Sequence, residues 1–176
     1  MDNLISPTKT RLFIAFVDML GYAKLASHIH DPLQVFDLLD DLAKIIIRNV
    51  EATSGTVIKF IGDACLLVWQ EECGDECVLS LRTMLSQCEA HLRKIGRTNT
   101  FRATVHFGEA AIGPFGAAPH QRIDVFGDSV NRAATLGKGL DGSGTIVSPQ
   151  AFDKLSESTK TLFHRKAADK VYYSRG

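Results

Sequence analysis

The stretch from Thr56 to Trp69, TVIKFIGDACLLVW, contains two runs of β-branched and aromatic residues separated by Gly62-Asp63. Two such runs around a two-residue step are typical of a β-hairpin. Lys59 interrupts the first run, and a lysine inside an apolar strand must reach solvent, pair with an acid or contact a ligand. Asp63 taken alone is an ordinary turn residue. The hairpin therefore carries two charges, and only Asp63 has a routine structural explanation.

The segments around the hairpin follow the order β-α-α-β-β-α-β. Leu12 to Asp18 is an apolar run that predicts a buried strand, and Asp31-Pro32 is typical of a helix start. This order indicates an α+β, ferredoxin-like core with an antiparallel sheet, helices on one face and C-terminal additions. Residues 1–10 are predicted to be a loose lead and residues 11–176 one domain. We further expect helices over 22–27, 32–54, 76–95, 127–137 and 150–156, and strands over 101–109, 110–116, 122–126, 145–147 and 170–173.

Composition narrows the function classes. Lysine plus arginine and aspartate plus glutamate each number 20, so the formal net charge is zero. This balance gives no support for binding nucleic acid or a membrane surface by bulk electrostatics. No apolar run approaches membrane-spanning length. The 4 cysteines form no CxxC pair, so we interpret them as reduced thiols of a cytoplasmic protein.

Two carboxylates stand at strand ends that the predicted fold brings together. Asp18 ends the first strand and Asp63 lies in the hairpin turn. Two convergent carboxylates with nearby carbonyls are a common way to hold Mg²⁺ or Mn²⁺ for phosphate chemistry. The backbone N–H groups of Leu20, Gly21 and Tyr22 follow at a helix start, where a phosphate can bind. Spacing alone also fits the alternative of two turn aspartates and a capping loop.

Four segments in one order resemble the catalytic domain of the class III nucleotidyl cyclases. The resemblance covers roughly residues 13–152, which is nearly the whole chain. One such motif would be weak evidence, whereas four at the family's spacing are specific. The segments are FVDMLGY (Phe16–Tyr22), KFIGDA (Lys59–Ala64), RATVHFGE with the following GPFG (Arg102–Gly116), and DVFGDSVNRAATL (Asp124–Leu136).

The resemblance implies a metal and ribose site. Asp18 and Asp63 correspond to the two metal-binding aspartates, and the carbonyl of Met19 is implied as a further ligand. Two Mg²⁺ or Mn²⁺ ions would bridge the triphosphate and lower the pKa of the ribose 3′-hydroxyl, which attacks the α-phosphate. Asn131 corresponds to the asparagine that orients the ribose.

The resemblance also implies a base-reading pair, Lys59 and Asp124. Lysine can donate to a ring nitrogen of adenine, and aspartate can accept from its exocyclic amine. Family guanylyl cyclases usually carry Glu and Cys at these positions, so ATP is the expected substrate. A further lysine of the family binds the terminal phosphates beyond the last helix, where this chain offers Lys166 and Lys170.

Family sites lie at a dimer interface. Metal carboxylates come from one subunit, and base-reading and ribose-orienting residues come from the other. Lys59 and Asp63 would then serve opposite sites although they are only four residues apart. Since this sequence carries both halves, a homodimer with two equivalent sites is expected.

The chain departs from the family at Thr135, where an arginine usually neutralises charge on the α-phosphate. Threonine occupies the same helix face as Asn131 but brings no charge. Loss of such a donor can cost orders of magnitude in rate. Lys138, seven positions after Asn131, or the long side chain of Arg132 are candidates for partial rescue.

Two functions follow. The first is an adenylyl cyclase that makes 3′,5′-cyclic AMP and pyrophosphate. The alternative is a catalytically weak cyclase-like module that binds nucleotide or regulates a partner, which Thr135 favours. Nothing in the sequence resembles a sensor, so a signal would come from a separate regulatory domain, a partner cyclase chain or an ion.

Overall fold

The computed structural model describes residues 6–138, 142–166 and 171–174. The first half of the chain follows the predicted order. It comprises β1 (Thr8–Met19), α1 (Tyr22–Ser27), α2 (Pro32–Glu51), β2 (Thr56–Ile61), β3 (Ala64–Gln70), the 3₁₀ turn η1 (Glu71–Cys73), α3 (Gly74–Lys94) and β4 (Phe101–Phe115). The second half comprises β5 (Arg122–Phe126), α4 (Asp128–Thr135), β6 (Gly144–Val147), α5 (Pro149–Asp153), α6 (Glu157–Lys160), β7 (His164–Lys166) and β8 (Val171–Ser174).

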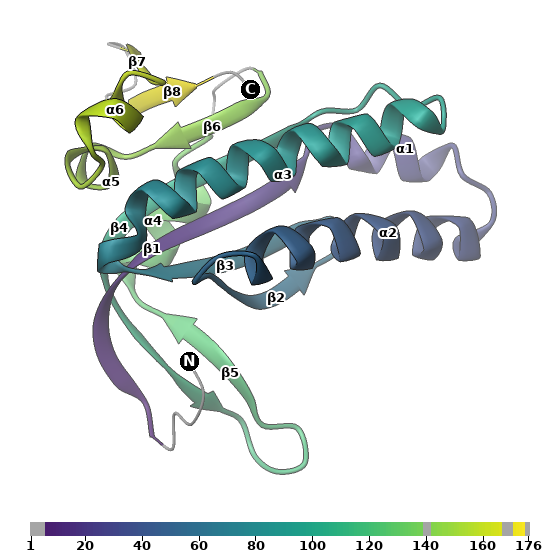
Figure 1. The fold of residues 1–176 in the computed structure, drawn as a ribbon. Coiled ribbons are helices and arrows are strands. Elements are labelled where there is room, and N and C mark those ends of the chain that lie inside the picture. The colour runs from purple at the N-terminus through teal and green to yellow at the C-terminus, as the bar shows by residue number, and fades with distance from the viewer. Residues whose placement is uncertain (1–5, 139–141, 167–170, 175–176) are drawn as a thin grey trace.

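One sheet organises these elements. Its strand order is β2-β3-β1-β4-β6-β8-β7, and β5 pairs with β4 outside this path. Only β4 and β6 pair in parallel, and the other strand pairs of the described residues are antiparallel. The long helices α2 and α3 lie side by side over one face, while β5 and the outer ends of β1 and β4 extend away from the body (Figure 1). The predicted α+β class is confirmed.

The central strand β1 is buried on both faces. Phe13, Ala15 and Val17 pack in the main core with the residues of α2 and α3. Leu12 and Ile14 point the other way, into a second cluster that includes Ala133 of α4. Because both faces are covered, the strand reads as a continuous apolar run rather than an alternating one. α4 therefore lies on the opposite face from α2 and α3.

Element boundaries differ from the predictions in several places. β1 begins at Thr8, which pairs with Ile112, so residues 8–10 belong to the sheet and not to a loose lead. Residues 101–115 form one strand instead of two, because β1 and β5 pair along its outer half. α4 ends at Thr135 rather than near residue 137. Lys170 lies outside the described residues, and α6 and β7 were not predicted. In the described ranges, no helix has the length and apolarity needed to cross a membrane.

Candidate active site

The hairpin turn and the end of β1 bring Asp18 and Asp63 together. Gly62 has φ of 62°, a left-handed conformation that suits glycine, and the turn places Asp63 directly before β3. β1 pairs with β3 in a register that matches Val17 with Cys65. Asp18 thus lies one residue beyond this pair, and its charge and a hydrogen bond both act on Asp63.

These two carboxylates suit a divalent cation. The pKa of Asp63 is raised to about 6, first by burial and then by Asp18, while main-chain N–H groups of Asp63 and Met19 oppose the shift. A bound cation would relieve this repulsion, and carboxylate and carbonyl oxygens are the donors that Mg²⁺ and Mn²⁺ prefer. Among the described residues, no group of three or more His, Cys, Asp or Glu is placed to hold a metal ion, so substrate phosphates and water would complete the coordination.

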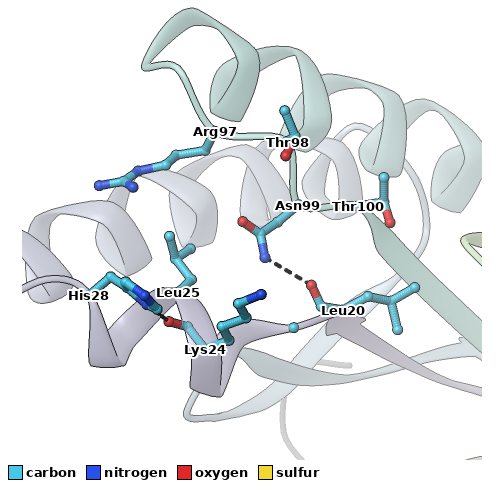
Figure 2. A pocket seen from close by; sticks show the side chains of 9 residues that line it. Leu20, Lys24, Leu25, His28, Arg97, Thr98, Asn99 and Thr100 are labelled. Carbon is cyan, nitrogen blue, oxygen red and sulfur yellow. Dashed lines mark hydrogen bonds between the residues drawn. The ribbon is translucent and has the colours of Figure 1, made fainter.

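The turn between β1 and α1 offers fewer free N–H groups than predicted. The Leu20 N–H donates to the carbonyl of Thr100 at 2.8 Å. Asn99 donates its side-chain amide to the Leu20 carbonyl at 3.0 Å (Figure 2). Leu20 is therefore held by the loop before β4 and is not a phosphate donor. Gly21 and Tyr22 remain as the candidate donors of the three.

Lys59 and Asp124 contact each other within one chain. The Nζ atom of Lys59 lies 2.6 Å from Oδ2 of Asp124, and Oδ1 of Asp124 accepts the N–H of Val125 at 2.8 Å. The pairing of β2 with β3 shifts between Val57 and Lys59, and such a bulge re-aims a side chain. The Lys59 side chain is 41% exposed and that of Asp124 14%, so the pair is open on the lysine side.

α4 carries Asn131 and Thr135 on its exposed surface. The hydroxyl of Thr135 donates to the carbonyl of Asn131 at 2.8 Å, so its hydrogen is already used inside the helix. Arg132 is tied to Asp128 by an exposed ion pair of 2.5 Å. Exposed pairs of this kind contribute little and break readily.

Lys138 lies near Asp18, but not because it shares a helix face with Asn131, as the sequence had predicted. α4 ends at Thr135, so the helix-face relation to Asn131 does not extend to Lys138. Lys138 instead lines a pocket of about 240 Å³ together with Asp18 and Arg102 of the same chain.

Arg102 received no role in the sequence analysis. It pairs with Asp18 across β1 and β4, and its guanidinium donates to the carbonyl of Gly137 at 3.1 Å. The signal that would find it is the register of these two strands, which is a long-range property. Lys166 lies in β7, and Lys170 is outside the described residues.

Paired carboxylates beside a helix-start turn, on a ferredoxin-like sheet, define a domain suited to metal-dependent phosphate chemistry. The chain belongs to the adenylate and guanylate cyclase catalytic domain family, whose family model matches residues 5–173. The predicted family membership is thereby confirmed, and with it the coarse assignment as a nucleotidyl cyclase domain.

Individual similarities are distant. An adenylate cyclase of Anabaena cylindrica is 25% identical over an alignment of 135 residues that covers 72% of this chain and 26% of that protein. The chain thus spans about a quarter of that relative. The crystal structure of the adenylyl cyclase CyaB from P. aeruginosa superimposes with a TM-score of 0.83 at 18% identity and covers 97% of this chain and 96% of its own. The crystal structure of the guanylyl cyclase Cya2 superimposes with a TM-score of 0.71 at 18% identity, and the match covers 94% of this chain and 90% of that one.

Proposed function

We propose that this domain is an adenylyl cyclase that converts ATP to 3′,5′-cyclic AMP and pyrophosphate. The ribose 3′-oxygen attacks the α-phosphorus and loses its proton. The bond from the α-phosphorus to the oxygen that bridges to the β-phosphate breaks, and pyrophosphate leaves. The observation that carries the assignment to ATP is the Lys59–Asp124 pair at 2.6 Å.

The base-reading pair keeps hydrogen-bonding capacity beyond its own contact. An ammonium has three donors and each carboxylate oxygen can accept more than once. Lys59 can therefore donate to N1 of adenine while Asp124 accepts from the 6-amino group. The family description covers adenylate and guanylate cyclases alike, so the base preference rests on this pair.

The remaining residues act on the phosphates and the ribose. Asp18, Asp63 and the Met19 carbonyl would hold two Mg²⁺ or Mn²⁺ ions. When bound, these ions would stabilise triphosphate charge and lower the pKa of the 3′-hydroxyl. Asn131 orients the ribose. The phosphate contacts are assigned to the N–H groups of Gly21 and Tyr22 and to the cations Arg102 and Lys138.

A homodimer is the proposed assembly. Phe60, Ile61, Phe115 and Phe126 are large apolar side chains that are 40–60% exposed, on β2, β4 and β5 around the base-reading pair. Exposed apolar groups of this kind mark protein interfaces. A second copy that covers them would bring its own Asp18 and Asp63 to the Lys59–Asp124 half. The free cysteines and the use of ATP support a cytoplasmic location.

Thr135 supports the alternative function, a weak or regulatory cyclase-like module. Its hydroxyl donates to the Asn131 carbonyl and supplies no positive charge. If none of Arg102, Arg132 and Lys138 compensates, nucleotide binding persists without turnover. A partner cyclase chain with the missing arginine would then restore the rate.

Purified protein with Mn²⁺ and either ATP or GTP tests both functions. We expect cyclic AMP from ATP and at least about tenfold less cyclic GMP. Guanine presents a carbonyl to Asp124 where adenine presents its 6-amino group, so the charge-assisted hydrogen bond is lost. Asp63→Ala should lower kcat on the order of a hundredfold or more. Asp37→Ala, which removes an exposed carboxylate of α2, is the matched control. No product from either nucleotide, with nucleotide binding retained, would support the regulatory module instead.

A further inference from the structure

A second pocket lies behind the turn that joins β1 to α1. Its volume is about 450 Å³, within the range of small-molecule sites. Figure 2 shows Lys24 and Leu25 of α1 and the following His28 on one side and the loop from Arg97 to Thr100 on the other. Leu20 and Gly21 complete the lining.

The lining of this pocket is positively charged. Of the residues that the structure describes, Lys24 and Arg97 both line it, and no aspartate or glutamate does. Within the ranges that the structure describes, neither cation forms an ion pair, and Arg97 is half-buried. Net charge over the whole chain is zero, so two unpaired cations in one cavity are a local feature.

Neutral hydrogen-bond donors also line the pocket, but the neutral ring of His28 offers no free donor. Thr98 and Thr100 bring hydroxyl groups to the lining. The Nδ1 atom of His28 lies 2.6 Å from the carbonyl of Lys24, and a carbonyl only accepts, so Nδ1 carries the hydrogen. In the neutral ring the other nitrogen is then an acceptor. The attraction for an anion is therefore assigned to Lys24 and Arg97.

The pocket shares a wall with the candidate active site. Thr100 and Asn99 bind both the N–H and the carbonyl of Leu20, at 2.8 and 3.0 Å. Gly21, which follows Leu20, also lines the pocket and is a candidate phosphate donor of the active site. A ligand between α1 and the Arg97–Thr100 loop would thus fix the position of the phosphate-binding turn.

We propose that this pocket is a regulatory site for a small metabolite with a phosphate or dicarboxylate group, held by Lys24 and Arg97. Binding itself is independent of the proposed cyclase activity, while its effect on the rate rests on that function. The bound anion fixes the position of the β1–α1 turn and thereby changes the affinity of the active site for nucleotide, without occupying the substrate site.

Direct binding is the first test. Inorganic phosphate and malonate are titrated separately into protein that contains EDTA and no nucleotide, with isothermal calorimetry and amide NMR shifts as readouts. At least one of the two probes should bind saturably and shift the amides of Gly21 and Asn99. Arg97→Gln and Lys24→Gln should each weaken its binding roughly tenfold, because each removes a charge-assisted hydrogen bond. Lys94→Gln is the matched control, since Lys94 is exposed at the end of α3, near Arg97, and does not line the pocket.

The outcomes separate the source and the site. A response to phosphate alone assigns a phosphorylated ligand, and a response to malonate alone assigns a carboxylate. Equal affinity of the wild type and Arg97→Gln, or no saturable binding of either probe, overturns the proposal. Competitive displacement by a non-hydrolysable ATP analogue also overturns it, because the anion would then occupy the substrate site.

The rate effect has its own readout. In the active protein, the binding probe should change KM for ATP at least twofold, and Arg97→Gln should abolish the change while basal turnover stays within about twofold of wild type. A protein without turnover would refute the proposed cyclase activity yet leave the binding result intact. Intact binding without any effect on KM or kcat would refute regulation through the turn.

Discussion

Burial acts on two titratable side chains in opposite directions. It raises the pKa of Asp63 to about 6 and lowers that of His106, because in each case the neutral form is favoured. His106 lies in β4, and its Nδ1 atom is 2.9 Å from the hydroxyl of Ser148. The charge of Arg132 lowers its pKa further, while Asp128 opposes this effect.

His106 should make stability depend on pH. Its folded pKa lies below the ordinary value of 6.5, so the unfolded chain takes up the proton first as the pH falls. The stabilising contribution is complete above pH 6.5 and is lost as the pH falls toward the folded pKa. His106→Gln should therefore flatten the fall of Tm between about pH 7 and 5. Thermal unfolding at three pH values measures this, with exposed His30→Gln as the control. An unchanged slope in His106→Gln would contradict the assignment.

The candidate site residues differed in how far the sequence predicted them. Lys59 could be predicted because a charge inside an apolar strand needs a partner, and Asp124 is that partner within the chain. Arg102 was missed because its proximity to Asp18 depends on the β1–β4 register. The use of the Leu20 N–H by Thr100 depends likewise on a contact between distant segments.

At the scale of elements, local patterns predicted type and order well. The hairpin was foreseen from its turn residues and α2 from its cap and periodicity, and the N-cap of α2 forms as expected, since Asp31 accepts the N–H of Leu33 at 2.9 Å. Strand ends were predicted less well, because partners decide how far a strand continues. β4 runs through Gly108 and Gly113 because β1 and β5 supply hydrogen bonds on that stretch.

The turn between α2 and β2 should tolerate no side chain at Gly55. A Cβ atom there would lie 2.5 Å from Cε2 of Trp69, which is fully buried and donates to Thr53 at 3.1 Å. Gly55→Ala should lower the free energy of unfolding by about 1–3 kcal/mol through overpacking. Urea unfolding measures the change. In a Trp69→Phe background the same substitution should cost less. Equal costs in both backgrounds would rule out the indole clash.

At the scale of the whole molecule, the two proposed halves of a site lie at separate places in one chain. Asp18 and Asp63 interact at one end of the hairpin, and Lys59 meets Asp124 of β5. The sequence alone cannot distinguish a site that forms within one chain from a site that two subunits share. The proposed dimer makes this distinction testable, because variants with defects in different halves can be mixed.

Two inactive variants should complement each other. Asp63→Ala removes the metal half and Asn131→Ala the ribose half, so in a mixed dimer one site carries both defects and the other carries none. An equal mixture with free exchange should recover about a quarter of wild-type activity if the two sites turn over independently, and up to about a half if they alternate, since half of the dimers are mixed and each has one intact site. Cyclic AMP production against mixing ratio measures this. Activity no greater than that of the separate variants would contradict sites shared between subunits.

The β2–β3 hairpin places Lys59 and Asp63 four residues apart on one continuous piece of backbone. In the proposed dimer these residues face different substrates. A base that draws Lys59 toward it would tilt the turn and displace Asp63 from the other triphosphate. Such a hairpin would couple the two active sites of the dimer. We therefore expect the sites to alternate, so that only one of them turns over at a time.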